Sequence, residues 1–409
     1  MIKFKIIILN LHMSKKKSLV VDAYEKAFRV KTDCEYLPDE DDYPYTDLIE
    51  EKIVKSKKGE IDVIKDVKVI DVIYCQKYVK DGTGIYSGWI SNSQKMLRRG
   101  KVKELLASVV KIVDTGSLFT SNIVNRLFKV MISEDIGIAG KYDLVEKCSR
   151  FIKMYDGYRI SEKTPDMILK FKNDMIKLVI EMGMSKKSRL VDNLICLVKI
   201  RNLNLKIKPE EKVFYELFDI LKNKEIEISN LIFSASILMW MDGCNLEKTR
   251  YENIDLFGFE RKRKKIYLVW NWIISESRKL SRELENCNKN LLEIYETSTD
   301  GILNLINAYL NLILFEELKD LKKEKTECDI SPFIDTWENI EKYDVWIDSV
   351  SYDKHTAVSN HCKYRNTLFF FVRFGSKLKN IIKGPSIYAL EKRIYCMLLK
   401  NVIVTEFKK

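Results

Sequence analysis

The chain has 409 residues, 46% of them hydrophobic and 32% charged, with only 6 proline and 15 glycine residues. This composition excludes a collagen-like or disordered protein and allows two or three domains with a large core. Lys and Arg outnumber Asp and Glu by 71 to 59, which gives a formal net charge of +12. Such an excess favours association with nucleic acid or another polyanion; a mixed-charge surface that keeps the protein soluble is the alternative.

Cysteine usage and the N-terminal residues indicate an intracellular protein. The nine cysteines stand singly, without a Cys-x-x-Cys pair, which favours reduced thiols and argues against a zinc or iron–sulfur site. The apolar run from Ile6 to Leu11 is far shorter than the roughly 20 residues of a membrane span, so no membrane segment is expected. Met1 and Met13 are both candidate starts. The heavy use of Ile, Lys and Asn is typical of an AT-rich genome, such as that of a virus or a mobile element.

Residues 1–85 are predicted to form a small mixed α/β region. Apolar and polar residues alternate loosely between Ile61 and Tyr74, which is typical of one or two strands. The glycine-rich segment from Lys80 to Gly84 ends the region as a loop. It is not a phosphate-binding loop, because no Gly-Lys-Ser/Thr follows the glycines.

Residues 86–205 are predicted to be a helical domain. Its clearest helix spans Val102 to Val113, where apolar residues recur every three or four positions and form one stripe. Gly116 is suited to a left-handed cap at the end of this helix. A second helix is expected to begin at a cap formed by Ser121 or Asn122. The residues expected to face inward from it are Ile123, Leu127, Val130 and Met131.

Two more helices are predicted in this domain. Two further regions are predicted after it. Thr164-Pro165 marks the start of one helix, because proline is tolerated in a first turn, and Gly183 marks its end. The other carries an apolar face of Leu190, Leu194, Leu197 and Val198. Residues 206–325 are predicted to form a second helical domain, and residues 326–409 a C-terminal region.

A series of motifs between residues 90 and 200 follows the order found in a known family. Arg99-Gly100 precedes the apolar helix, and Gly116, Arg126-Leu127 and Ser133-Glu134-Asp135-Ile136-Gly137 follow. Ser185-Lys186-Lys187-Ser188 then stands between two helices. In order and spacing, these motifs resemble the C-terminal helical region of the RarA/MgsA-type AAA+ ATPases, which act at stalled replication forks.

The resemblance implies a helical module that supports homo-oligomerisation, of a kind that occurs as a stand-alone protein in large DNA viruses and phages. The family's ATPase motif, G-x-x-x-x-G-K-[ST], is missing from this chain, so ATP hydrolysis is not implied. Arg126 precedes Glu134 by two turns and is expected to pair with a carboxylate, and Gly137 permits a positive φ. The matched residues with an expected structural role are Gly100, Arg126, Ser133, Glu134, Asp135 and Gly137.

Two basic clusters are candidate contacts to nucleic acid. The first contains Lys95, Arg98, Arg99 and Lys101 at a helix start, where positive charge opposes the helix dipole and therefore suggests phosphate contact. The second is the run Arg261, Lys262, Arg263, Lys264 and Lys265, which is interpreted as a loop before a strand or a buried helix. A nuclear import signal and a solvated surface are the alternatives for this run. The aromatic residues Tyr267, Trp270 and Trp272 either stack on bases or belong to the core.

A third group of residues is a candidate metal site near the C-terminus. Asp353, His355, His361 and Cys362 could ligate a divalent ion, and Asp344, Asp348 and Asp353 could form a nuclease carboxylate set. Polar surface positions and an acidic helix face are the favoured interpretations. His355 and His361 would converge only across a tight turn, so no metal and no cofactor is expected.

Together these patterns predict a mainly α-helical protein, a multi-helix bundle with the small mixed N-terminal region. The expected function is that of a non-enzymatic, DNA-associated or oligomeric scaffold of viral or mobile-element origin, linked to replication or genome maintenance. It is expected in the nucleus or cytoplasm of a host cell or in a virion. Two alternatives stay open: a metal-dependent nucleic-acid enzyme using Asp353, His355 and His361, and a structural virion or interaction protein without nucleic-acid contact.

Overall fold

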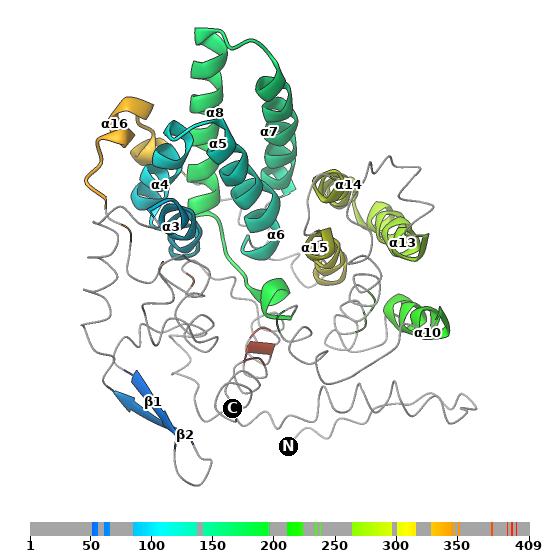
Figure 1. Ribbon diagram of the computed structural model, residues 1–409. Helices are drawn as coiled ribbons and strands as arrows, with labels where there is room; N and C mark the ends of the chain where they lie inside the picture. The colour runs from blue at the N-terminus through cyan, green and yellow to red at the C-terminus, as the bar shows by residue number, and fades with distance from the viewer. Residues whose placement is uncertain are drawn as a thin grey trace.

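The computed structural model describes residues 51–55, 61–65, 85–136, 142–194, 196, 211–223, 264–296, 301–315 and 329–345, with the single positions 234, 238, 347, 351, 378, 391, 394, 395 and 398. These residues form a multi-helix bundle (Figure 1). The mainly α-helical class predicted from the sequence is therefore confirmed.

Two short strands are described in the N-terminal region. β1 (Glu51–Lys55) pairs antiparallel with β2 (Ile61–Lys65), and Ile53 lies opposite Val63. β2 falls within the stretch that was predicted to contain strands, whereas β1 was not predicted. The glycine-rich segment 80–84 lies outside the described residues.

The first group of helices runs from residue 85 to residue 184. In chain order it contains α3 (Ile85–Arg99), α4 (Val102–Asp114), α5 (Ser117–Val124), the π-helical segment η2 (Asn125–Met131), α6 (Ile132–Glu134), α7 (Tyr142–Ile160) and α8 (Pro165–Met184). α4 contacts α3, α5 and α8, and α7 packs against α8. The predicted apolar stripe of α4 is buried inside this group, from Val102 to Ile112.

The turn between α3 and α4 depends on Gly100. This residue has a φ of 61°, a left-handed conformation that glycine adopts without steric cost. The N–H of Gly100 donates to the carbonyl of Leu97 at 3.1 Å, and the N–H of Lys101 donates to the carbonyl of Met96 at 3.0 Å. This pair of bonds is a Schellman motif, which satisfies carbonyl groups left open at the end of α3.

The start of the second helix differs from the prediction. α5 begins at Ser117, and Gly116 before it has φ 138° and ψ 174°, a positive-φ conformation but not the left-handed helical one predicted. Ser121 and Asn122 lie inside α5 and do not cap it; the Ser121 hydroxyl donates to the Ser117 carbonyl one turn earlier at 3.2 Å. The inward-facing residues are confirmed: Ile123, Leu127, Val130 and Met131 are all buried.

α7 and α8 form a hairpin that extends beyond the other labelled helices at the top of Figure 1. The start of α8 is as predicted: the Thr164 hydroxyl accepts a 3.3 Å hydrogen bond from the N–H of Met167, and Pro165 opens the first turn. Near the other end of α8, Gly183 lets the helix approach α4 closely. A Cβ at this position would lie 3.2 Å from side-chain atoms of both Val102 and Leu105.

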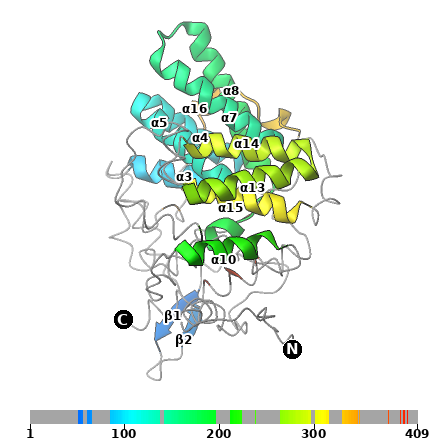
Figure 2. The ribbon, with the colours of Figure 1, turned by 90° about the vertical axis from the view of Figure 1, so that its right-hand side faces the viewer.

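A second group of helices packs against the first. It contains α10 (Glu211–Lys222), α13 (Lys264–Leu280), α14 (Arg282–Glu296) and α15 (Gly301–Leu314). Figure 2 shows α13, α14 and α15 side by side, with α10 below them. α14 contacts α7, and α15 contacts α6, so buried residues of both groups form one continuous hydrophobic core. Residue 205, the predicted boundary between two helical domains, lies outside the described residues.

A short segment after residue 328 covers the first group on another side. It contains the 3₁₀ turn η4 (Ser331–Phe333) and α16 (Trp337–Glu341), which contacts α4 and α8. The Thr336 hydroxyl accepts a 3.3 Å hydrogen bond from the N–H of Asn339 and so caps α16. Trp337 is buried, and its indole N–H donates to both carboxylate oxygens of Asp114 at 3.0 and 3.1 Å.

Candidate functional site: a buried charge cluster and a basic pocket

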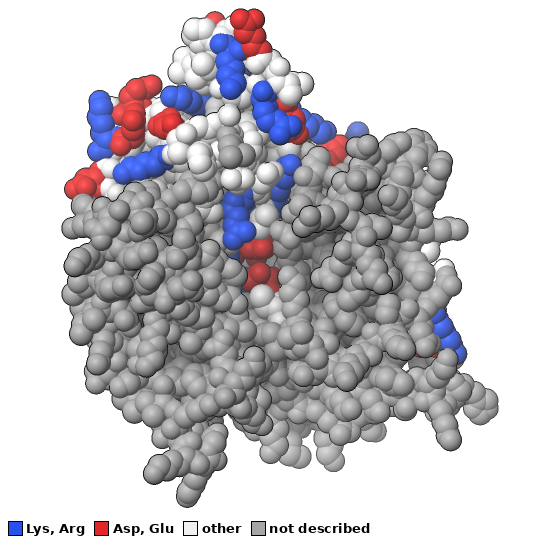
Figure 3. Space-filling model, in the orientation of Figure 1, with Lys and Arg blue, Asp and Glu red and all other residues white. Residues whose placement is uncertain are grey.

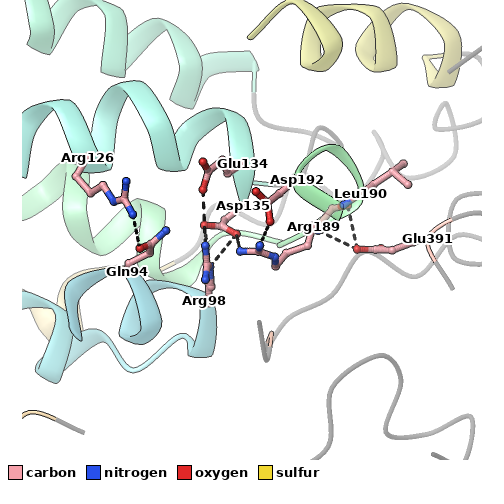
Figure 4. A network of polar contacts seen from close by, with 10 residues as sticks. Gln94, Arg98, Arg126, Glu134, Asp135, Arg189, Leu190, Asp192 and Glu391 are labelled. Atoms are coloured by element: carbon pink, nitrogen blue, oxygen red, sulfur yellow. Dashed lines mark hydrogen bonds and ion pairs between the residues drawn. The ribbon is translucent and has the colours of Figure 1, made fainter. Parts of the chain in front are cut away.

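A cluster of buried charges forms around Asp135, which follows α6 (Figure 4). The Arg98 Nε group, in the last turn of α3, donates to both carboxylate oxygens of Asp135 at 3.0 Å. Arg189 Nη1 donates to Asp135 Oδ1 at 2.9 Å. Both arginines are 1% exposed and Asp135 is 0% exposed, so two buried cations share one buried carboxylate inside the protein.

Further carboxylates surround the two arginines. Glu134 Oε2 lies 3.7 Å from Arg98 Nη2, and Asp192 forms an ion pair with Arg189. Glu391, distant in sequence, accepts a 2.8 Å hydrogen bond from the backbone N–H of Arg189. The cluster therefore connects α3, the end of α6, the segment 187–192 and position 391.

Burial shifts the pKa of two of these carboxyl groups upward. It raises the pKa of Glu134, and the neighbouring charge of Asp135 adds to the rise while Arg98 opposes it. Burial also raises the pKa of Glu391 from 4.5 to about 7, against the lowering effect of the Arg189 N–H. Both shifts have the same main cause: a carboxylate removed from water is less stable in its charged form.

Lys187 supports the cluster by completing the end of α8. Its buried ammonium group donates, at 2.8, 3.0 and 2.6 Å, to the carbonyl oxygens of Met182, Gly183 and Ser185. Carbonyls in this position lack an intrahelical N–H, and a positive charge also complements the helix dipole. Ile136 forms an antiparallel bridge with Lys187, and the Ser188 N–H donates to the Asp135 carbonyl at 3.1 Å.

The geometry of the cluster is that of a structural junction. A group that performs acid–base chemistry must reach its substrate, and the charges of Arg98, Asp135 and Arg189 are enclosed and paired with one another. The predicted partner of the carboxylates is wrong: Arg126 donates to Gln94 Oε1 at 2.9 Å instead. Of the other family-motif residues, Gly100 forms the turn after α3, Ser133 lies within α6, and position 137 is outside the described residues.

The first predicted nucleic-acid cluster is largely internal, which contradicts the expectation of an exposed helix start. Arg98 and Arg99 lie in the last turn of α3, where their charges complement the helix dipole rather than oppose it. Lys95 and Arg98 are each 1% exposed and Arg99 is 9% exposed, so their side chains do not face solvent as phosphate contacts would. Lys101 is exposed in the turn that follows.

The second predicted cluster is only partly described. Positions 261–263, with Arg261, Lys262 and Arg263, lie outside the described residues. Lys264 and Lys265 begin α13, so the segment after the basic run is a helix and not a strand. Of the aromatic residues expected either to stack on bases or to join the core, Trp270 is 0% exposed and therefore belongs to the core. Trp272 packs edge-on against Phe218, with 6.1 Å between ring centroids.

A pocket of about 200 Å³ lies between the α4–α5 turn and the α7–α8 hairpin, and the sequence did not predict it. Three cations line it: Arg159 at the end of α7, Lys163 in the hairpin turn and Lys172 in α8. None of the three forms an ion pair with a carboxylate in the described part of the chain. Aromatic side chains, Tyr155, Tyr158 and Phe171, also line the pocket.

Aromatic rings contact two of the three pocket cations. Lys163 Nζ lies 5.3 Å from the ring centroid of Tyr158, and Lys172 Nζ lies 4.9 Å from that of Trp337. Asp114 is the carboxylate in the lining, and both of its oxygens accept from Trp337. Burial raises the pKa of Asp114, while Trp337 and Lys172 oppose the rise. With three cations and one carboxylate, the lining carries a net positive charge.

The candidate metal residues cannot be placed together. Positions 348, 353, 355, 361 and 362, which hold the two histidines, Cys362 and two of the aspartates, lie outside the described residues. Asp344 is exposed after α16 and not on a helix, unlike the acidic helix face that was expected. In the described part of the chain, no group of three His, Cys, Asp or Glu residues could hold a metal ion.

On the face seen in Figure 3, basic and acidic side chains are interspersed over the described helices. No helix among the described residues is both long and apolar enough to cross a membrane. Comparisons of the chain with family models, with curated proteins and with solved structures give no match.

Proposed function

We propose that the chain is a non-enzymatic helical scaffold that associates with nucleic acid, DNA above all, through phosphate contacts. The observation that carries the proposal is the rim of the pocket, where Arg159, Lys163 and Lys172 form no ion pair with a described carboxylate. Binding of phosphates by cations without a carboxylate partner is favourable, because condensed counterions are released from the nucleic acid. The net charge of +12 acts in the same direction.

The proposal keeps the biological setting expected from the sequence. A scaffold of this kind would serve replication or genome maintenance of a virus or mobile element, in the host nucleus or cytoplasm or in the virion. It places the phosphate contacts mainly at the pocket rather than at the turn after α3, because Lys95 and Arg98 are enclosed by the bundle.

The test is the salt dependence of binding to labelled duplex DNA, single-stranded DNA and RNA. We expect binding at low salt with an affinity that falls steeply as salt rises, by a logarithmic slope of about 0.7–0.9 per phosphate contacted. Arg159→Glu combined with Lys163→Glu should weaken binding to every nucleic acid that the protein holds at this rim. If wild-type protein binds none of the three at low salt, the proposal is wrong.

A second candidate function is self-association, and a specific observation favours it. The apolar stripes that suggested oligomerisation through residues 90–200 are buried within the chain, so they offer no surface to a second copy. Ile160 and Leu169, at the tip of the α7–α8 hairpin, are 83% and 58% exposed. Burying these two side chains between copies would stabilise a dimer by roughly 25 cal/mol for each Å² removed from water.

Light scattering at tens of micromolar protein tests this second candidate. We expect a mass above that of the monomer, and a return to the monomer mass in the variant Ile160→Asp, Leu169→Asp. Tyr215→Asp is the matched control, because Tyr215 is 44% exposed on α10, away from the hairpin. A monomeric wild-type protein would exclude self-association, and a dimer that survives the double substitution would exclude the hairpin tip as its interface.

A further inference from the structure

The pocket between the α4–α5 turn and the α7–α8 hairpin combines cations with an aromatic ring in one half-open space. We infer that it holds one unpaired nucleotide of a single-stranded nucleic acid, with the base against Tyr158 and the phosphate at the rim formed by Arg159, Lys163 and Lys172. The inference rests on the proposed function and deepens it, because it specifies the form of nucleic acid and the residues that distinguish it.

The size of the pocket suits a single small unit. Its volume of about 200 Å³ is below the roughly 300–1,000 Å³ of pockets that hold drug-sized ligands. The space is lined from three sides, by the α4–α5 turn, by the end of α7 and by the first turns of α8. A strand of nucleic acid would therefore insert one nucleotide here while its neighbours stay on the surface.

Tyr158 provides a fixed ring on which a base can stack. One face of this ring stacks on Phe171, with 4.6 Å between ring centroids and 6° between the ring planes. The ammonium of Lys163 also lies over this ring, 5.3 Å from the centroid, and the face that Phe171 does not cover is the one on which a base would stack. Lys163 is exposed and has a flexible stem, so a base can displace its ammonium group and leave it free to contact the phosphate.

The rim offers several groups that favour a phosphate. Three positive charges come from Arg159, Lys163 and Lys172. The one carboxylate in the lining, Asp114, accepts a hydrogen bond from the Trp337 indole, and the charge of Lys172 acts on it. The N-terminus of α5 opens at the same place, since Gly116 and Ser117 line the pocket. Gly116 has no side chain that could cap the first N–H groups of α5, and the helix dipole there favours an anion.

The aromatic ring decides between the candidate partners. A phosphopeptide would satisfy the cations but offers no planar base for Tyr158. A duplex offers phosphates, but its bases are already stacked on one another and are not exposed to a side chain. Single strands bind by the combination seen here, a cationic groove for the backbone with aromatic side chains for the bases.

Fluorescence anisotropy with three probes tests the inference: a labelled oligothymidylate, a duplex of the same length, and the mononucleotide dTMP as a competitor. The pocket variants are Tyr158→Leu, Arg159→Ala and Lys163→Ala. Tyr215→Leu and Lys170→Ala are matched controls, because both residues are exposed and neither lines the pocket. Far-UV circular dichroism and thermal unfolding verify that each variant is folded.

We expect Tyr158→Leu to weaken binding of the oligothymidylate by about 5-fold or more, since stacking of a base on an aromatic side chain is worth about 1–3 kcal/mol. Arg159→Ala and Lys163→Ala should each lower the logarithmic salt slope by about 0.7. The control variants should bind as wild type does, and the strand should bind more tightly than either the duplex or dTMP.

The other outcomes separate this inference from the proposed function. Binding of the oligothymidylate that is equal in pocket and control variants would overturn the inference and leave the scaffold function intact. Equal affinity for the duplex and the single strand would contradict the inference that the pocket binds an unpaired nucleotide. Equal affinity for dTMP and the strand would also contradict it, because the ligand would then be a free nucleotide and not part of a strand. Binding of no nucleic acid by the wild-type protein would overturn both proposals.

Discussion

Asp135 is the residue on which most of the described charge network depends, and its partners lie far away in the sequence. Arg98 and Arg189 are separated from it by 37 and 54 positions. The sequence suggested a structural role for Glu134 and Asp135 but assigned Arg126 as the partner. Helical spacing identifies only neighbours on the same helix, so a partner supplied by another helix could not be found in this way.

Replacing Asp135 by Asn should strongly destabilise the protein. The substitution removes the negative charge that the buried Arg98 and Arg189 share, while the shape of the side chain stays nearly the same. Breaking a buried pair by removing one partner typically costs about 3–5 kcal/mol. Urea denaturation followed by circular dichroism measures the change in the free energy of unfolding.

Asp219→Asn is the matched control for this substitution. Asp219 forms a 2.8 Å ion pair with Lys222, but the two side chains are 71% and 42% exposed. An exposed pair contributes at most about 1 kcal/mol, so the control should unfold at nearly the wild-type urea concentration. If Asp135→Asn has as small an effect as the control, the negative charge of Asp135 does not stabilise the fold.

At the scale of helices, the elements predicted correctly were those whose sequence signals lie within the helix itself. The apolar stripe of α4 repeats at helical spacing, and Thr164-Pro165 is both a cap and a first turn for α8. The backbone hydrogen bonds at the ends of α4 and at the start of α8 connect residues three or four positions apart. Their formation depends little on the rest of the fold, which is why the sequence alone was sufficient.

Other helices were missed or misread for physical reasons. Arg98 and Arg99 were interpreted as a helix start because an apolar helix follows, but Gly100 ends α3 with its left-handed conformation. The sequence assigned 86–205 to helices without separating α7. The π-helical segment η2 has no sequence signal of its own, because one wider turn hardly changes the hydrophobic spacing. α7 and the hairpin turn carry Tyr158, Arg159 and Lys163, so the pocket could not be assembled from the sequence.

At the scale of the whole molecule, residues near the C-terminus complete the first group of helices. Trp337 bonds to Asp114, Ser351 donates to Asn92 Oδ1 at 2.9 Å, and Glu391 joins the charge cluster. The first two contacts connect residues 223 and 259 positions apart and the third connects residues 202 positions apart, and each of them is buried or partly buried. Contacts of this length are decided by the packing of the whole core and not by local spacing, so the predicted division at residue 326 could not reveal them.

The contact of Glu391 predicts how stability depends on pH. The pKa of this carboxyl group is about 7 in the folded protein, above its ordinary value of 4.5. Between these two values the folded state holds a proton that the unfolded state has released, so stability falls as pH rises from about 4.5 to about 7 and then stays constant. The full loss at pH 8 is on the order of 3 kcal/mol.

Glu391→Gln should remove this pH dependence. A glutamine keeps the oxygen that accepts from the Arg189 N–H, and it carries no charge at any pH. We expect the variant to be more stable than wild type at pH 8 and nearly equal to it at pH 4, as measured by urea denaturation across that range. Asp219→Asn again serves as control, because Asp219 is exposed and lies outside the charge cluster. A variant that is less stable than wild type at pH 8 would mean that the charged form of Glu391 stabilises the junction with Arg189 and that its pKa is not raised.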